Sequence, residues 1–84
     1  MFFLKRAERI RNEARAAWHV ADDAWEAELV REFGHDAPAR RYQVAGRSTP
    51  RLERLYLAAE TARMAYIEAE RALNALLEMP RKAA

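Results

Sequence analysis

Apolar residues recur with a helical period along the first part of the chain. Their steps of three and four keep one face of an α-helix apolar. The positions are Phe3, Ala7, Ile10, Ala14, Ala17, Trp18, Ala21, Trp25 and Leu29. Gly34 follows the pattern, and glycine can adopt the left-handed conformation that ends a helix. The pattern therefore predicts a long helix over about residues 3–33.

A second apolar pattern follows Thr49 and has a strict seven-residue repeat. One set of positions is Leu52, Ala59, Tyr66 and Leu73, and the other is Leu55, Ala62, Ala69 and Leu76. Thr49 is a good N-cap, and Pro50 suits the first helical position, where a backbone N–H would have no partner. Pro80 cannot continue a helix. We therefore predict a second helix over about residues 50–78 and a tail over 80–84.

The two predicted helices carry small residues on their apolar faces. Alanines at positions 7, 14, 17, 21 and 24 would face alanines at 59, 62 and 69. The predicted fold is all-α: an antiparallel two-helix hairpin with a close-packed alanine-rich seam and a long ordered loop over 35–49. We expect residues 1–84 to form one domain. Because so short a chain buries only a thin core, we also expect two hairpins to dimerise into a four-helix bundle.

Charge is distributed unevenly along the first helix, which is basic at its start and acidic at its end. The helix dipole favours the reverse order by a few tenths to about 1 kcal/mol per charge. Antiparallel docking resolves this conflict. It places the acidic end beside Arg51 and Arg54, and the basic start beside Glu68 and Glu70. The charges therefore favour antiparallel packing and leave few basic residues for an external partner.

Composition limits the classes of function. The chain has no cysteine, no run of about 18 apolar residues and no secretory signal, so we expect a cytoplasmic protein without a membrane span. The net charge of +2 is too small to indicate nucleic-acid binding by itself. A glycine-rich phosphate loop and a nucleophile–histidine arrangement are both missing from the sequence. We therefore expect no enzymatic activity, cofactor, metal site or small-molecule substrate.

The connection over residues 35–49 is longer than a helical hairpin needs. Its basic and aromatic residues, with the first arginine of the next helix, are Arg40, Arg41, Tyr42, Arg47 and Arg51. Guanidinium groups bind phosphate or carboxylate, and a tyrosine ring can stack on a base, so one interpretation is an anion or nucleic-acid contact. The other is a structural plug, in which Tyr42 and Val44 close the end of the hairpin and the arginines neutralise the acidic helix end.

Three apolar residues of the second helix, Leu57, Met64 and Ile67, are expected opposite its heptad positions. In a lone hairpin they would contact water, so we predict a partner interface there, with a second copy or with another protein. The alternative is that the loop or the tail covers them.

The start of the chain is apolar and then basic. We expect Phe2, Phe3 and Leu4 to close the hairpin against the last apolar residues of the second helix, which are Leu76, Leu77 and Met79. A basic amphipathic segment of this kind could instead lie on an anionic membrane surface.

These features support two functional hypotheses. The first is a small protein-interaction module that docks on a protein partner as inhibitor, adaptor or regulator, as accessory proteins of phages and mobile elements do. The second is a dimeric nucleic-acid-binding hairpin that uses the basic loop. The predicted architecture is similar, at the level of fold only, to small plasmid-encoded RNA-binding hairpins that dimerise into four-helix bundles.

Overall fold

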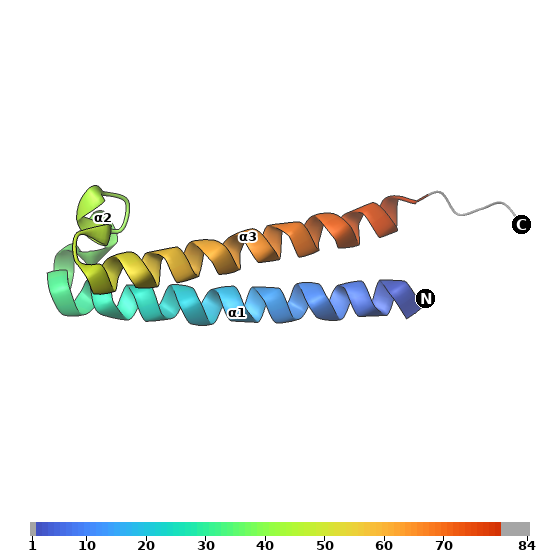
Figure 1. Cartoon of the computed structure of the whole chain (residues 1–84), viewed down its shortest axis with the longest axis horizontal. Helices are drawn as coiled ribbons and strands as arrows, with labels where there is room; N and C mark the ends of the chain where they lie inside the picture. The colour runs from blue at the N-terminus through green and yellow to red at the C-terminus, as the bar shows by residue number, and fades with distance from the viewer. Residues whose placement is uncertain (1, 80–84) are drawn as a thin grey trace, which may run out of the picture.

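The computed structural model describes residues 2–79, which form an antiparallel hairpin of two long helices. Helices α1 (Phe2–Phe33) and α3 (Pro50–Glu78) pack along their length (Figure 1). Three short helical segments join them: η1 (Gly34–Asp36), α2 (Ala37–Arg40) and η2 (Val44–Arg47). The described residues contain no β-strand, so the predicted all-α hairpin is confirmed. The predicted tail over 80–84 lies outside the described residues.

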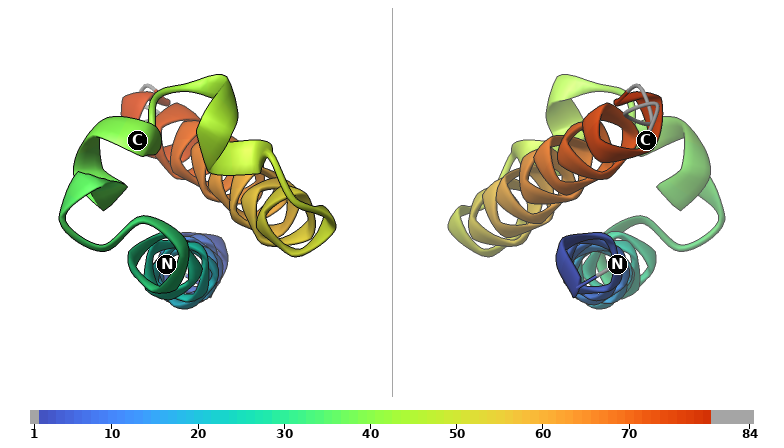
Figure 2. Two further views of the ribbon diagram at one scale, coloured as in Figure 1. Left: turned by 90° about the vertical axis from the view of Figure 1, so that its left-hand side faces the viewer. Right: turned by 90° about the vertical axis from the view of Figure 1, so that its right-hand side faces the viewer.

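The overall shape is an elongated rod of 60 × 20 × 18 Å. The two long helices cross obliquely when viewed from either end, and the short segments lie against the end where α1 passes into α3 (Figure 2). No helix in residues 2–79 is long and apolar enough to cross a membrane.

Local sequence signals set the inner ends of both long helices. Gly34 has a φ of +56°, a left-handed conformation that a residue with a Cβ rarely adopts, and α1 ends immediately before it. Thr49 caps α3, because its hydroxyl oxygen accepts a hydrogen bond from the backbone N–H of Leu52 at 3.1 Å. Pro50 then occupies the first helical position.

Both helices use a seven-residue repeat in the seam between them. The seam residues of α1 are Leu4, Ala7, Arg11, Ala14, Trp18, Ala21, Trp25 and Glu28, and those of α3 are the eight predicted heptad residues. All are buried or half-buried. Arg11 lies in this seam because it forms an ion pair with Glu70 of α3, with Nη1 and Oε2 3.5 Å apart. The seam is therefore alanine-rich but includes charged residues.

The prediction of which α1 residues face α3 was wrong at four positions. Phe3, Ile10, Ala17 and Ala24 are all exposed. They precede the seam residues Leu4, Arg11, Trp18 and Trp25 by one position each, so they form a separate stripe on the flank of the seam. The apolar pattern followed this flank because Arg11 and Glu28, which do lie in the seam, are charged.

The predicted closure at the termini is also mostly absent. Phe2 and Phe3 are each 72% exposed, Leu77 is 59% exposed and Met79 is 63% exposed. Leu4 and Leu76, which do occupy seam positions, are half-buried. The exposed residues at this end fall outside the seven-residue repeat, so the hairpin has no apolar face to bury them against.

The main hydrophobic core lies at the opposite end, around Trp25. Its side chain packs with Leu29, Ala37 and Leu52, all four residues being buried. The indole N–H donates a hydrogen bond to the carbonyl oxygen of Gly46 at 3.0 Å, which ties η2 to α1. A glycine is required there, because a Cβ at position 46 would lie 2.7 Å from the carbonyl oxygen of Arg40.

The connection closes this end, but not with the residues that the plug interpretation named. Tyr42 is 85% exposed and Val44 is 77% exposed. Ala37 and Gly46 are buried instead. Only small residues fit at this end of the hairpin, because the backbone of the connection's short helical turns lies directly against α1 and Trp25.

Replacement of Trp25 should test this core. We expect Trp25→Ala to leave the chain largely unfolded, because loss of a buried aromatic costs about 3–5 kcal/mol, comparable to the whole stability of a domain of this size. Trp25→Phe keeps a ring but leaves the Gly46 carbonyl unpaired, which should cost about 1–3 kcal/mol. Urea unfolding followed by far-UV circular dichroism measures both, with Val30→Ala, at an exposed position, as the control. Equal unfolding midpoints for all three variants would contradict this account.

Candidate functional site

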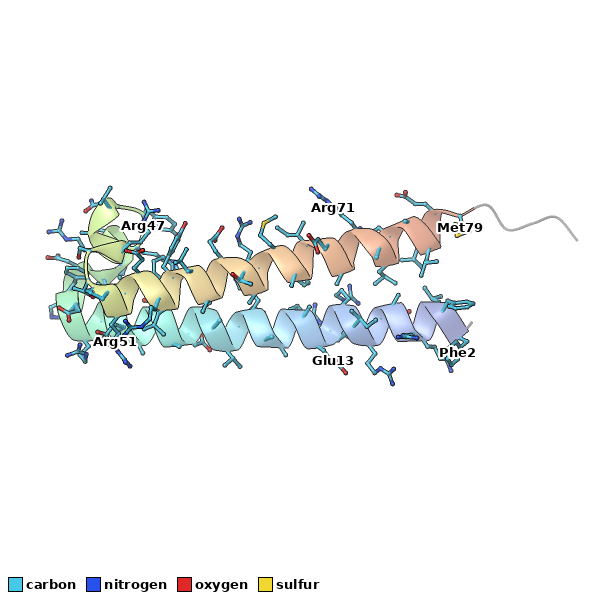
Figure 3. All side chains as sticks on the ribbon, viewed as in Figure 1. Phe2, Glu13, Arg47, Arg51, Arg71 and Met79 are labelled. Atoms are coloured by element: carbon cyan, nitrogen blue, oxygen red, sulfur yellow. The ribbon has the colours of Figure 1, made fainter. Side chains whose placement is uncertain are left out.

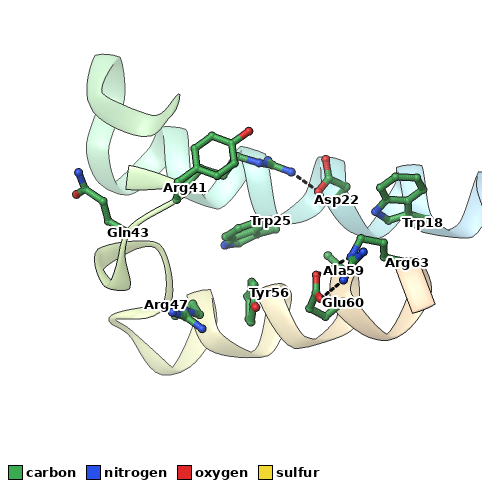
Figure 4. Close-up of a pocket in the computed structure, with 11 residues that line it drawn as sticks. Trp18, Asp22, Trp25, Arg41, Gln43, Arg47, Tyr56, Ala59, Glu60 and Arg63 are labelled. Carbon is green, nitrogen blue, oxygen red and sulfur yellow. Dashed lines mark hydrogen bonds and ion pairs between the residues drawn. The ribbon is translucent and has the colours of Figure 1, made fainter. Parts of the chain in front are cut away.

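A groove of about 330 Å³ lies beside the core, between the two long helices and the connection (Figure 4). Aromatic and charged side chains line it, namely Trp18, Asp22, Trp25, Arg41, Tyr42, Gln43, Arg47, Tyr56, Ala59, Glu60 and Arg63. A concave surface with mixed apolar and polar groups is the usual form of a binding site.

Arg41 is held by three groups of this groove and its edge. Its guanidinium forms ion pairs with Asp22 and with Glu26, the latter at 2.8 Å, and lies 4.6 Å from the centre of the Trp25 ring. Burial opposes the charged form, but the hydrogen bonds that Arg41 donates to the two carboxylates outweigh it and raise the pKa of Arg41. Arg41 therefore contributes mainly to the internal structure.

The other residues predicted to contact an anion are dispersed. Arg40 donates to the amide oxygen of Gln43 at 3.0 Å, and Arg47 lies 4.9 Å from the centre of the Tyr56 ring. Arg51 lies at the seam, on another side from the groove, where it pairs with a glutamate (Figure 3). The structure thus brings Arg41, Tyr42 and Arg47 to the groove, but not Arg40 or Arg51.

Most aromatic rings of the groove already have a neighbour on a face. Trp18 stacks with Tyr66 and His19 at centroid distances of 5.4 and 5.5 Å. Trp25 and Tyr56 each have a guanidinium beside the ring. The prominent exposed ring is that of Tyr42. The groove is therefore poorly prepared for stacking of successive nucleobases, which requires accessible ring faces.

Arg41 and Arg40 form a matched pair for testing this assignment. Arg41→Ala removes two ion pairs and the contact with Trp25, so we expect a loss of about 1–2 kcal/mol in the free energy of unfolding. Arg40→Ala should change it by less than about 0.5 kcal/mol. Chemical denaturation measures both changes. A larger effect at Arg40 than at Arg41 would show that the internal role is assigned to the wrong residue.

The predicted interface residues of α3 differ in exposure. Leu57 and Met64 are 52% and 46% exposed, and they are seven residues apart on the outer surface of the helix. Ile67 is half-buried. An interface at these residues stays a prediction, and Arg71 continues the outer row beyond Met64.

A more extensive apolar surface lies on a different side of the hairpin, which we call the apolar side. Its residues are Ile10, Ala17, Val20, Ala24 and Ala27 of α1 and Ala58, Thr61, Ala65, Ala72 and Ala75 of α3, and all are exposed. In both helices they recur next to the seam in steps of three, four and seven, and the step of seven skips Glu13 in α1 and Glu68 in α3. The two rows share one side because Arg31 and Arg51, which continue them, both pair with Glu28.

Sequence reasoning missed this surface for an identifiable reason. It assigned Ala17 and Ala24 to the seam, and it did not consider the alanines at 58, 65 and 72. The second step pattern in each helix was a usable signal. Alanine, however, is also common in any helix, so the sequence alone did not show which of two adjacent stripes is covered.

Glu28 ends the apolar side near the connection. It is only 5% exposed, and its carboxylate oxygens accept hydrogen bonds from Arg31 at 2.9 Å and from Arg51 at 3.1 Å. The hydrogen bond from Arg31 is the main cause that lowers the pKa of Glu28 to about 2, against the opposing effect of burial, and the bond from Arg51 adds to it.

The Glu28 cluster makes stability depend on acid pH. Because the pKa of Glu28 is about 2 in the folded state and 4.5 ordinarily, its contribution is complete above about pH 4.5 and is lost as the pH falls towards 2. We expect Glu28→Gln to be less stable than the wild type at pH 6 and to lose less stability between pH 5 and pH 2. Urea midpoints measured across this range provide the comparison. Parallel pH curves for the two proteins would contradict the assignment.

Comparison with protein-family models, curated proteins and solved structures gave no match to this chain. The roles of its residues are therefore inferred from their geometry.

Proposed function

We propose that this hairpin is a non-enzymatic protein-interaction module, which docks on a protein partner as an inhibitor, adaptor or regulator. The observation that carries the proposal is the apolar side, where two adjacent helices expose rows of small and apolar residues, each interrupted once by a glutamate, Glu13 in α1 and Glu68 in α3. Val20, at its centre, is 71% exposed, and Ile10 is 46% exposed. Docking of a further helix pair there would complete a four-helix bundle.

Small side chains suit this surface to helix packing. Alanines at 17, 24, 58 and 65 leave both backbones accessible, so a partner helix can approach closely there. Larger apolar residues in the partner would fill the shallow space between α1 and α3. Burial of these alanines removes apolar area from water, which favours association.

The charged groups of the groove support a non-enzymatic role. Asp22 and Glu26 both pair with Arg41, and Glu60 pairs with Arg63 at 2.7 Å. The pKa of Glu60 is lowered, chiefly by its hydrogen bond from Arg63. Catalytic carboxylates that transfer protons near neutral pH require the opposite shift. The nucleic-acid alternative is weakened by the same internal pairing, since Arg41 and Arg51 already bind carboxylates.

Two matched substitutions test the proposal. Val20→Asp places a charge on the apolar side, and Met64→Asp places the same charge on the outer surface of α3. Both positions are exposed, so both variants should remain folded by circular dichroism. We expect Val20→Asp to weaken partner binding at least tenfold and Met64→Asp to leave it nearly unchanged. The measurement is capture of a partner from a nuclease-treated lysate of the source organism, followed by titration with that partner.

Two other outcomes of this experiment would contradict the proposal. Loss of binding in Met64→Asp alone would move the interface to Leu57, Met64 and Ile67. Captured material that disappears on nuclease treatment would instead favour a nucleic-acid contact at the connection, through the exposed Tyr42 and Arg47.

A further inference from the structure

The apolar side also carries a pattern of charge that points to a particular occupant. We propose, building on the function above, that this side binds a second copy of the same chain, with the two hairpins antiparallel and related by a two-fold axis at Thr61 and Val20. The inference rests on three exposed charged residues at the margins of the apolar side: Glu13, Arg54 and Glu68. None of the three forms an ion pair within residues 2–79.

Arg54 and Glu68 are placed symmetrically about Thr61. Each is seven residues from it on α3, one before and one after, so all three lie on the same face of the helix. Arg54 and Glu68 are about 21 Å apart along the axis, which prevents them from pairing within one chain. When two α3 helices pack antiparallel with Thr61 at the centre, Arg54 of each lies opposite Glu68 of the other. One two-fold axis thus creates two ion pairs.

The first long helix fits the same centre. Arg11 pairs with Glu70, so these two residues lie at the same height along the rod. Because the helices are antiparallel, a residue that follows Arg11 by a given number of positions is level with the residue that precedes Glu70 by the same number. Val20 is therefore level with Thr61, and Glu13 is level with Glu68. The axis that pairs the α3 helices also places Val20 opposite Val20 of the second copy, so the largest apolar side chain at the middle of the surface is buried.

Charge excludes the parallel arrangement. With both hairpins pointing the same way, the acidic row of Glu13 and Glu68 would face its own copy, and four carboxylates would lie at one height. Like charges opposed across an interface are strongly unfavourable, whereas the antiparallel arrangement places Glu68 against Arg54 and keeps the two acidic rows apart.

The available area is consistent with a dimer of moderate affinity. The overlap runs from Ile10 to the equivalent height on the other side of Val20, which is about 30 Å along the helices. The rod is 20 × 18 Å in cross-section, so about 600 Å² of each chain would be covered. A total of about 1,200 Å² lies at the lower end of the range for specific complexes. We therefore expect association at micromolar concentrations rather than an obligate dimer.

Cross-linking tests the position of the axis. The chain has no cysteine, so one engineered cysteine reports one contact. Under mild oxidation of the full-length protein, we expect Thr61→Cys and Val20→Cys each to form disulfide-linked dimers in high yield. Met64→Cys, on the outer surface, is the matched control and should remain monomeric on a denaturing gel. Efficient cross-linking through position 64 and not through position 61 would overturn the proposal.

Charge reversal tests the pairing itself. We expect Glu68→Arg to weaken dimerisation at least tenfold in sedimentation equilibrium, and Arg54→Glu to do the same. The double variant E68R/R54E should restore it, because each pair is present again with its signs exchanged. An equimolar mixture of the two single variants should form a heterodimer for the same reason. A dimer indifferent to all of these changes would overturn the proposed arrangement.

The same experiments separate this inference from the function on which it rests. If the wild type remains monomeric up to about 1 mM, the second copy is excluded as the occupant. Capture of another protein that Val20→Asp abolishes would then leave the function standing. If Val20→Asp affects neither self-association nor capture, the apolar side has no role and both proposals fail.

Discussion

Burial of Trp25 is the interaction on which the rest of the hairpin depends. Its ring joins Leu29 and Leu52 in the one end of the rod where large side chains are fully enclosed, and its N–H holds the backbone of Gly46. Together with Leu29 and Leu52, the ring forms the apolar surface on which Ala37 of the connection packs. The connection is long because it must cover one side of this core. It does so by packing its backbone closely, at Ala37 and Gly46, rather than with large side chains.

Charged residues contribute to the seam at both ends of the hairpin. Glu28 with Arg51, and Arg11 with Glu70, join α1 to α3 at points far apart along the rod. The half-buried Arg11–Glu70 pair adds little stability by itself, whereas the buried Glu28 depends on its arginine partners. Their positions nevertheless specify one antiparallel register, which an alanine-rich seam would leave poorly defined because alanines pack similarly in several registers. The unequal charge of α1, unfavourable for an isolated helix, is thereby explained by its partner helix.

The internal contacts of the hairpin leave the apolar side uncovered. The basic residues of the connection are largely used internally: Arg41 holds two carboxylates and Arg47 lies on Tyr56. The apolar side, in contrast, has no neighbour within the described residues. Glu13, Arg54 and Glu68 border it and form no ion pair within residues 2–79, and Arg54 and Glu68 are each seven residues from Thr61 at its centre. The proposed protein-interaction role, with the proposed self-association through this side, would explain both the missing burial and the charge pattern.

The sequence by itself determined the helical class, the start of α3 at Pro50, the end of α1 at Gly34 and the antiparallel direction. These depend on local periodicity, on capping groups next to each other in the chain, and on summed charge. Only the tertiary structure decided which of two adjacent stripes of α1 forms the seam, because Arg11 and Glu28 can be buried only with partners that lie far away in sequence. It also decided that Ala37 and Gly46, rather than Tyr42 and Val44, close the hairpin, since that choice depends on the space left beside Trp25. The position of the apolar side follows from the choice of seam, because the stripe of α1 that does not pack against α3 is the one left exposed.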